Sequence, residues 1–152
     1  MEKQVAELIK IIKDSACSVL EELGPGWLEA IYQKAMEVAL RDKGIMYETQ
    51  RILPITYAGH VIGESIPDLV VWLKNDGKKM AVIVELKSDS AIKEEFPVQV
   101  SKYIKELRKQ VRENEEVWST GILINFIKEA NSKKVTEGFE DLGGIQVIEV
   151  AC

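Results

Sequence analysis

The chain has 152 residues, of which 46% are hydrophobic and 30% charged, and its formal net charge is −5. This length and composition favour one globular domain over residues 1–152 and exclude a disordered or collagen-like chain, while the acidic excess argues against bulk coating of nucleic acid. No apolar stretch approaches the roughly 18 residues that span a bilayer, and a single histidine with two cysteines excludes zinc clusters, histidine triads and a disulfide framework. We therefore expect a cytoplasmic protein without membrane contact.

Helical periodicity opens the chain. Apolar residues recur at steps of three and four from Val5 to Val19, which predicts one face of a helix. The run Leu23-Gly24-Pro25-Gly26 ends this helix, because proline cannot continue it and glycine suits the cap. A second helix is expected over about 27–43, and Gly44 ends it.

The period then changes from helical to extended. Strands are expected over 45–57, over 61–73 after a turn at 58–60, and over 80–87 after the hairpin signal Asn75-Asp76-Gly77. A helix over 94–113, a strand over 118–127, a polar loop and a last strand over 145–150 complete the chain. The order ααβββαββ predicts an α/β protein with a mixed sheet flanked by helices.

Two carboxylates on neighbouring strands are the strongest chemical signal. The hairpin folds the strands of Asp68 and Glu85 antiparallel, so the two acids can approach each other. Side chains alternate along a strand, so Glu85 and Lys87 point to the same face. Two close carboxylates repel unless a proton or a cation lies between them, and Mg²⁺ prefers such oxygen ligands. The alternative is that Glu85-Leu86-Lys87 is a solvated strand end with an incidental ion pair. The chain has a second acid-x-Lys triplet, Asp76-Gly77-Lys78, but this one forms the hairpin turn and is given no catalytic role.

A second group of residues lies at the start of the second helix. Glu29, Tyr32 and Gln33 stand at helical offsets of three and four, so they share a face. The alternative here is that Glu29 only stabilises the helix through its dipole and that Tyr32 is a half-buried packing residue.

These features together resemble the GxxExxY protein family of the PD-(D/E)xK nuclease superfamily. The resemblance is carried by Gly26-x-x-Glu29-x-x-Tyr32, by Pro67-Asp68, by Glu85-Leu86-Lys87 and by the strand Leu123-Ile124-Asn125-Phe126. It implies a restriction-endonuclease-like αβββαβ core, to which this chain adds an N-terminal helix.

The resemblance also implies roles for individual residues. Asp68 and Glu85 match the metal-binding acids, with the Leu86 carbonyl as a further ligand of Mg²⁺ or Mn²⁺, and Lys87 matches the catalytic lysine. Glu29 matches a helix-borne acid and Gln99 a glutamine of the next helix, which makes both catalytic candidates. Tyr32, Gln33 and Tyr103 are expected to contact the substrate.

The helix over 94–113 carries a basic stripe. Lys102, Lys105, Lys109 and Arg112 recur opposite the expected core face, so we expect the stripe to point away from the acids as a solvated surface. The alternative is that the stripe contacts phosphates. The leading hypothesis is a metal-dependent nuclease that hydrolyses nucleic acid, with DNA as its expected partner. The alternative is an inactive binding or assembly module with the nuclease fold, as a homodimer.

Overall fold

The computed structural model describes residues 1–128 and 140–151. Within this part, the elements in chain order are α1 (Glu2–Leu23), α2 (Glu29–Asp42), β1 (Met46–Glu48), β2 (Leu53–Tyr57), β3 (His60–Ser65), β4 (Leu69–Asn75), β5 (Lys78–Lys87), α3 (Glu95–Arg108), β6 (Glu115–Val117), β7 (Thr120–Phe126), β8 (Glu140–Asp141) and β9 (Ile145–Ala151). The α/β class with a mixed sheet flanked by helices is thereby confirmed, as is the additional helix ahead of the core.

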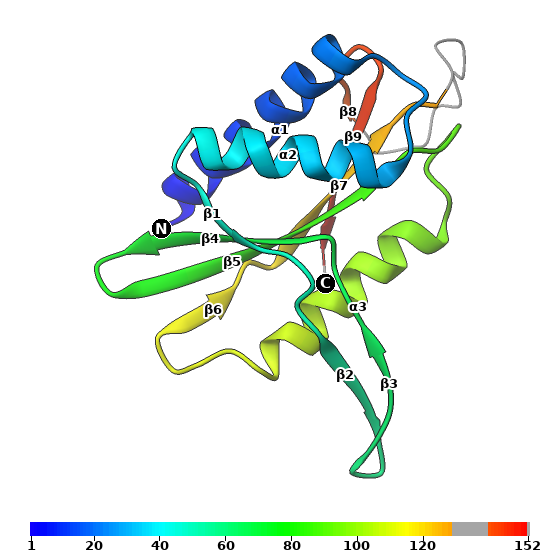
Figure 1. Ribbon diagram of the computed structural model, residues 1–152. Coiled ribbons are helices and arrows are strands. Elements are labelled where there is room, and N and C mark those ends of the chain that lie inside the picture. Colours follow the sequence, from blue (N-terminus) through cyan, green and yellow to red (C-terminus); the bar gives the residue numbers. More distant parts are fainter. Residues whose placement is uncertain (129–139, 152) are drawn as a thin grey trace.

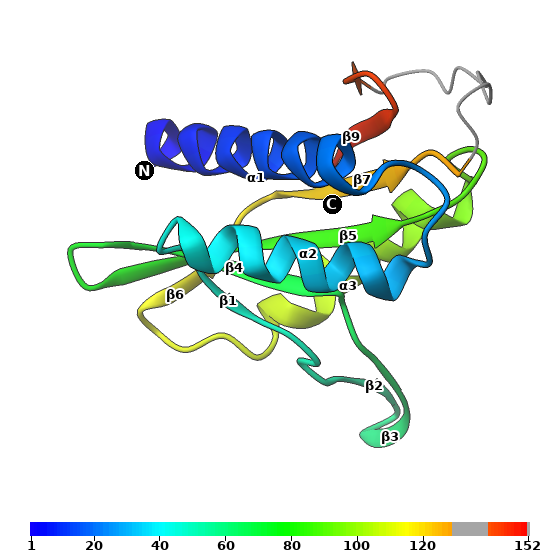
Figure 2. The ribbon, with the colours of Figure 1, turned by 45° about the horizontal axis from the view of Figure 1, so that its top comes forward.

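The main sheet has the order β1-β4-β5-β7-β9-β8, and β6 pairs with β5. The β4–β5 hairpin is antiparallel, β5 and β7 are parallel, and β7 and β9 are antiparallel. Helices α1 and α2 cover one face of this sheet and α3 covers the other (Figures 1 and 2). Strand β5 therefore lies at the centre of the sheet with a layer on each side.

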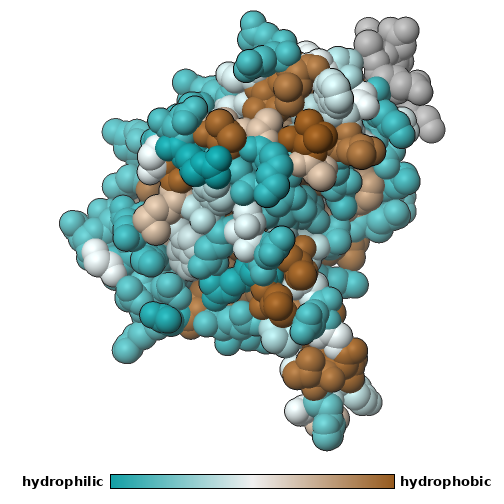
Figure 3. Space-filling model, viewed as in Figure 1, coloured by the Kyte–Doolittle hydropathy of each residue, from teal (hydrophilic) through white to brown (hydrophobic). Residues whose placement is uncertain are grey.

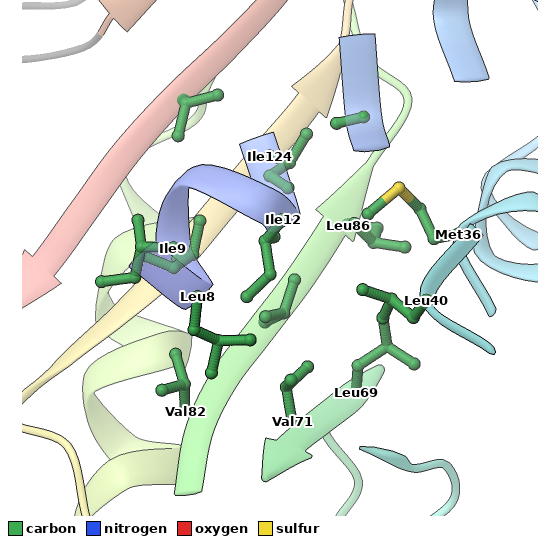
Figure 4. Packing of buried hydrophobic residues seen from close by; sticks show 14 of the residues in the cluster. Leu8, Ile9, Ile12, Met36, Leu40, Leu69, Val71, Val82, Leu86 and Ile124 are labelled. Atoms are coloured by element: carbon green, nitrogen blue, oxygen red, sulfur yellow. The ribbon is translucent and has the colours of Figure 1, made fainter. Parts of the chain in front are cut away.

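Side-chain alternation along β5 divides the core into two layers. Val82 and Leu86 point toward α1 and α2, where they join Ile12 and Met36 in one buried cluster (Figure 4). Ile83 belongs to the second cluster, on the α3 side. By the same alternation, Glu85 and Lys87 are directed to the α3 face, so this helix is the natural wall of any site that they form.

The close approach of α3 to the sheet depends on a glycine in β7. A Cβ atom added at Gly121 would overlap the Val100 side chain of α3 and would lie 3.3 Å from the carbonyl oxygen of Ile83. Any larger residue would push α3 away from the sheet, and with it the residues that α3 contributes near Glu85 and Lys87.

The predicted extent of two strands is wrong, because each predicted strand is two strands in the structure. The stretch 45–57 breaks after Glu48, where Gln50 adopts a φ of 55°. The stretch 61–73 breaks at Pro67, which has no N–H to donate to a ladder. The inner halves, β1 and β4, stay in the main sheet, while β2 and β3 pair only with each other. The last expected helix also ends early, at Arg108 rather than near residue 113, and the polar loop expected after residue 127 lies largely outside the described residues.

The β2–β3 ribbon, residues 53–65, projects from the body as an arm beside α3 (Figure 1). Its outer part is apolar and exposed (Figure 3), with exposed fractions of 74% for Tyr57, 65% for Val61 and 66% for Ile62. In the described part of the chain, no helix is long and apolar enough to span a membrane.

Candidate functional site

Asp68 and Glu85 interlock where the β4–β5 ladder ends. The last paired residues of the hairpin are Leu69 and Val84, so the two acids stand one step beyond it. The Asp68 N–H donates to Oε1 of Glu85 at 2.9 Å, and the Leu86 N–H donates to Oδ2 of Asp68 at 2.7 Å. The carboxylates thus accept the backbone hydrogen bonds at this end of the hairpin, and this fixes the direction of both side chains.

The environment of Glu85 disfavours its charge. Only 2% of the residue is exposed. Burial, followed by the charge of Asp68 and a hydrogen bond between the two carboxyl groups, raises the pKa of Glu85 to about 8, although Lys87 opposes the shift. Near neutral pH the pair therefore retains a proton in the absence of a cation.

Lys87 continues the same strand face and completes a compact group. Its Nζ lies 3.8 Å from Oε2 of Glu85 and 4.7 Å from the centre of the Phe96 ring, which belongs to α3. The side chain is 16% exposed, so the ammonium is held between a carboxylate and an aromatic face with limited access to water. The structure thus brings Asp68, Glu85 and Lys87 together.

Helix α3 adds two residues that form a chain of hydrogen bonds ending at Glu85. The Tyr103 side chain is hydrogen-bonded to Glu85, and Gln99 is hydrogen-bonded to Tyr103. Burial and the Glu85 carboxylate raise the pKa of the Tyr103 hydroxyl well above its usual range, so the phenol stays protonated and serves as a donor. Tyr103 is only 4% exposed, and Gln99 reaches Glu85 through it. Tyr103 and Gln99 also line a hollow between α3 and the β2–β3 ribbon.

Glu29 lies in the first turn of α2, on the exposed rim of this group. Partial burial raises its pKa, with Lys87 opposing the shift and Asp68 and Asp89 adding to it. Glu29 is therefore within electrostatic reach of the strand residues. Across the described residues, however, no three side chains of His, Cys, Asp or Glu stand close enough to hold a metal ion together.

The expectation that Tyr32 contacts a substrate is wrong, because its side chain is fully buried. Its hydroxyl donates to the Gly24 carbonyl at 2.7 Å and accepts from the Trp27 N–H at 3.3 Å, while its ring stacks on Phe126. The chain between these contacts turns through Gly26 at a φ of 96°, which favours glycine. Within this motif, the glycine and the tyrosine shape the loop that places Glu29.

Gln33 also contacts protein where a substrate contact was expected. Its Nε2 donates to the backbone carbonyl of Asp68 at 3.1 Å, which ties α2 to the residue that precedes β4. Gln33 thereby helps to fix the main chain beneath the Asp68 carboxylate.

Sequence reasoning missed the role of a buried polar side chain behind the site. Asn125 of β7 is fully buried and aligned with Lys87 in the parallel ladder. It accepts from the Asp89 N–H at 2.9 Å and donates to the Asp89 carbonyl and to Oε1 of Gln146. The loop after Lys87 is therefore anchored from below. The signal available was an asparagine inside an otherwise apolar strand.

A hollow of about 400 Å³ opens beside Lys87. It is lined by Lys87, Glu95, Phe96, Val98, Gln99 and Lys102. The prediction that the whole basic stripe points away from the acids is therefore wrong for Lys102. Another hollow, of about 580 Å³, lies under α1 and contains none of the residues discussed above.

The donor set fits a hard divalent cation. Oδ2 of Asp68 and Oε1 of Glu85 accept backbone N–H groups, the two carboxyl groups share a hydrogen bond, and Glu85 is also hydrogen-bonded to Tyr103. A cation between the two crowded carboxyl groups would take the place of the proton that they share. Oxygen donors of this kind suit Mg²⁺ and Mn²⁺, and a cation would relieve the repulsion that keeps the pair protonated.

Comparison with known proteins gives one family. A family model described as the PD-(D/E)XK nuclease superfamily matches residues 6–137, which is most of the chain. Searches of the curated proteins and of the solved structures found no significant match.

Proposed function

This chain belongs to the PD-(D/E)XK nuclease superfamily, and from that premise we propose that it is a Mg²⁺- or Mn²⁺-dependent nuclease that hydrolyses phosphodiester bonds, with DNA as its substrate and the cytoplasm as its location. The observation that carries the proposal is the pair of buried Glu85 and half-buried Asp68, with Lys87 at 3.8 Å from Glu85. Within the superfamily, the Gly26, Glu29 and Tyr32 pattern supports placement in the GxxExxY group.

Each residue has a role that follows from its position. Asp68, Glu85 and the Leu86 carbonyl would hold the divalent ion. When bound, such an ion supplies positive charge at a phosphoryl oxygen and makes a bound water more acidic. Lys87, constrained by Glu85 and Phe96, would donate to the attacking water or to the phosphate oxygen that gains charge.

Two further residues support this chemistry from the helices. Glu29, at the exposed rim, would accept a hydrogen bond from a water at the site and orient it. Gln99 would hold Tyr103 as a donor to Glu85, and this would fix the orientation of the Glu85 carboxylate. Tyr103 and Gln99 are therefore positioning residues rather than groups that touch the reacting atoms.

The test is a cleavage assay on purified protein with single- and double-stranded DNA and RNA, in Mg²⁺, in Mn²⁺ and in EDTA. We expect cutting that requires the metal and is lost in Glu85→Ala. Asp76→Asn is the control, because Asp76 lies in the hairpin turn at a φ of 49°, a conformation that asparagine tolerates. Cutting that persists in EDTA or in Glu85→Ala would refute the proposal.

A second candidate is an inactive module that assembles as a homodimer. The exposed apolar residues at the end of the β2–β3 arm favour it, since such patches often mark protein contacts. In this case no nucleic acid is cut under any condition, and the mass measured in solution by light scattering is that of a dimer.

A further inference from the structure

Two hollows meet on one ridge of α3. The first contains Lys87 and has a volume of about 400 Å³. The second, of about 360 Å³, lies between α3 and the β2–β3 arm and is lined by Ile55, Ser65, Gln99, Lys102, Tyr103 and Glu106. Gln99 and Lys102 line both hollows, so the two lie next to each other on either side of these side chains. Together they mark a path along α3 from Lys87 to the arm.

The spacing along α3 explains why this ridge faces the path. Gln99, Lys102, Tyr103 and Glu106 are separated by steps of three and four, so they share one helical face. Lys105 lines neither hollow, although it is also exposed and lies on the same helix. Lys102 and Lys105 therefore have the same charge and are both exposed on α3, but only Lys102 is directed toward the hollows.

The walls of the path combine two cations with apolar surface. Lys87 lines the first hollow, and Lys102 is an exposed cation that lines both. Ile55 is 38% exposed on the arm side and Val98 is 53% exposed on the side of Lys87. Glu95 and Glu106 also line the path and repel phosphate, so phosphate contact is confined to the neighbourhood of Lys87 and Lys102.

The size of the path selects the form of the substrate. Hollows of a few hundred Å³ accept groups of the size of small ligands. A nucleotide placed with its phosphate at Lys102 can rest its sugar and base against apolar side chains, as single-strand sites do with their stacking surfaces. A duplex carries closely spaced phosphates on both strands, and these would meet Glu95 and Glu106 as well as Lys102. The charges along the path therefore favour a single strand.

We propose that a single strand of nucleic acid runs from Lys87 through these two hollows to the β2–β3 arm, and that Lys102 contacts the phosphate that neighbours the one that is cut. This inference rests on the proposed nuclease function and names the substrate form and a contact that the function by itself does not specify.

The test compares Lys102→Ala with Lys105→Ala. Binding of a labelled single-stranded oligonucleotide is measured in EDTA at several salt concentrations, and cleavage kinetics are measured in Mn²⁺. We expect Lys102→Ala to weaken binding severalfold, to reduce the salt slope by about 0.7 and to raise KM with little change in kcat. Lys105→Ala should match the wild type, and Lys102→Arg should restore binding because it keeps the charge.

Several outcomes would overturn the inference. If the wild type cuts but the two alanine variants behave alike, Lys102 has no special contact and the nuclease function stands without this path. If the effect of Lys102→Ala is as large on a blunt duplex as on a single strand, the single-strand path is wrong. If the wild type neither binds nor cuts any nucleic acid, the proposed function fails and this inference fails with it. Thermal melts of the variants exclude unfolding as the cause.

Discussion

Asp68 and Glu85 each accept a hydrogen bond from the backbone of the other's strand, at 2.7 Å from the Leu86 N–H and at 2.9 Å from the Asp68 N–H. The two carboxylates therefore replace a backbone hydrogen-bonded pair at the end of the hairpin, and they also form the centre of the candidate site. A change in the charge of either carboxyl must alter both the stability of the hairpin and the chemistry of the site.

The first prediction concerns the stability of the metal-free protein as a function of pH. Because the folded-state pKa of Glu85 is raised to about 8 from 4.5, the folded protein binds more protons than the unfolded chain between these values, and stability falls as pH rises through them. Glu85→Gln keeps an acceptor for the Asp68 N–H without the charge. In EDTA it should raise the melting temperature relative to the wild type at pH 8.5, and raise it less at pH 5.5.

The control for the pH experiment is Asp76→Asn, which removes an acid from the hairpin turn at the other end of β4 and β5. The difference in melting temperature between Asp76→Asn and the wild type should not grow between pH 5.5 and pH 8.5. If Glu85→Gln changes the melting temperature by the same amount at both pH values, burial and Asp68 do not hold a proton on Glu85.

The second prediction is stabilisation by divalent ions. A ligand that binds only the folded state stabilises it by roughly 2.7 kcal/mol when the free ion is at 100 times its dissociation constant, and each kcal/mol corresponds to about 2–4 °C in a domain of this size. Millimolar Mn²⁺, and more weakly Mg²⁺, should raise the melting temperature at neutral pH. Glu85→Ala should abolish the rise and Asp76→Asn should preserve it. A wild-type melt that Mn²⁺ leaves unchanged would favour the inactive module.

The third prediction separates the structural part of the helix motif from its chemical part. Tyr32→Phe removes the hydroxyl that bridges Gly24 and Trp27 but keeps the ring on Phe126. It should lower the free energy of unfolding by about 0.5–1.5 kcal/mol, the net contribution of a hydrogen bond, because the partners of the hydroxyl are only partly buried and can bind water instead. Glu29→Gln, on the exposed rim, should leave the free energy of unfolding nearly unchanged and reduce cleavage. Urea unfolding and cleavage rates on both variants are the measurements, and a reversed pattern would contradict the assignment.

The site acids could be predicted from the sequence because local rules place them. The Asn75-Asp76-Gly77 turn sets the β4–β5 hairpin, and alternation along β5 then directs Glu85 and Lys87 to one face. Both steps depend on short-range geometry, which the amino-acid pattern carries directly.

The break that begins the arm could not be predicted, because it depends on a single backbone dihedral, whereas the break after the arm lies at Pro67, a residue that interrupts strands. Residues on both sides of Gln50 have extended character, and the break requires a φ of 55° at a glutamine, which gives no signal of the kind that glycine or asparagine gives. Lys102 was misplaced for a related reason. Its direction was inferred from the core face of its own helix, whereas the second hollow exists only because the arm stands beside α3.

The last prediction tests the anchor beneath the loop that follows Lys87. Asn125→Leu keeps a side chain of similar size but removes three hydrogen bonds, two to the backbone of Asp89 and one to Gln146. The free energy of unfolding should fall by about 1–3 kcal/mol, and amide hydrogen exchange should accelerate in residues 88–92. Leu8→Ala is the matched control: Leu8 is buried in the cluster under α1, on the other face of the sheet, and its truncation costs about 2–5 kcal/mol without touching the loop or α3. If Asn125 positions the loop, cleavage falls further in Asn125→Leu than in Leu8→Ala, although Leu8→Ala loses at least as much stability, and exchange at 88–92 rises only in Asn125→Leu. Equal exchange and equal cleavage in the two variants would reduce Asn125 to a contributor to general stability.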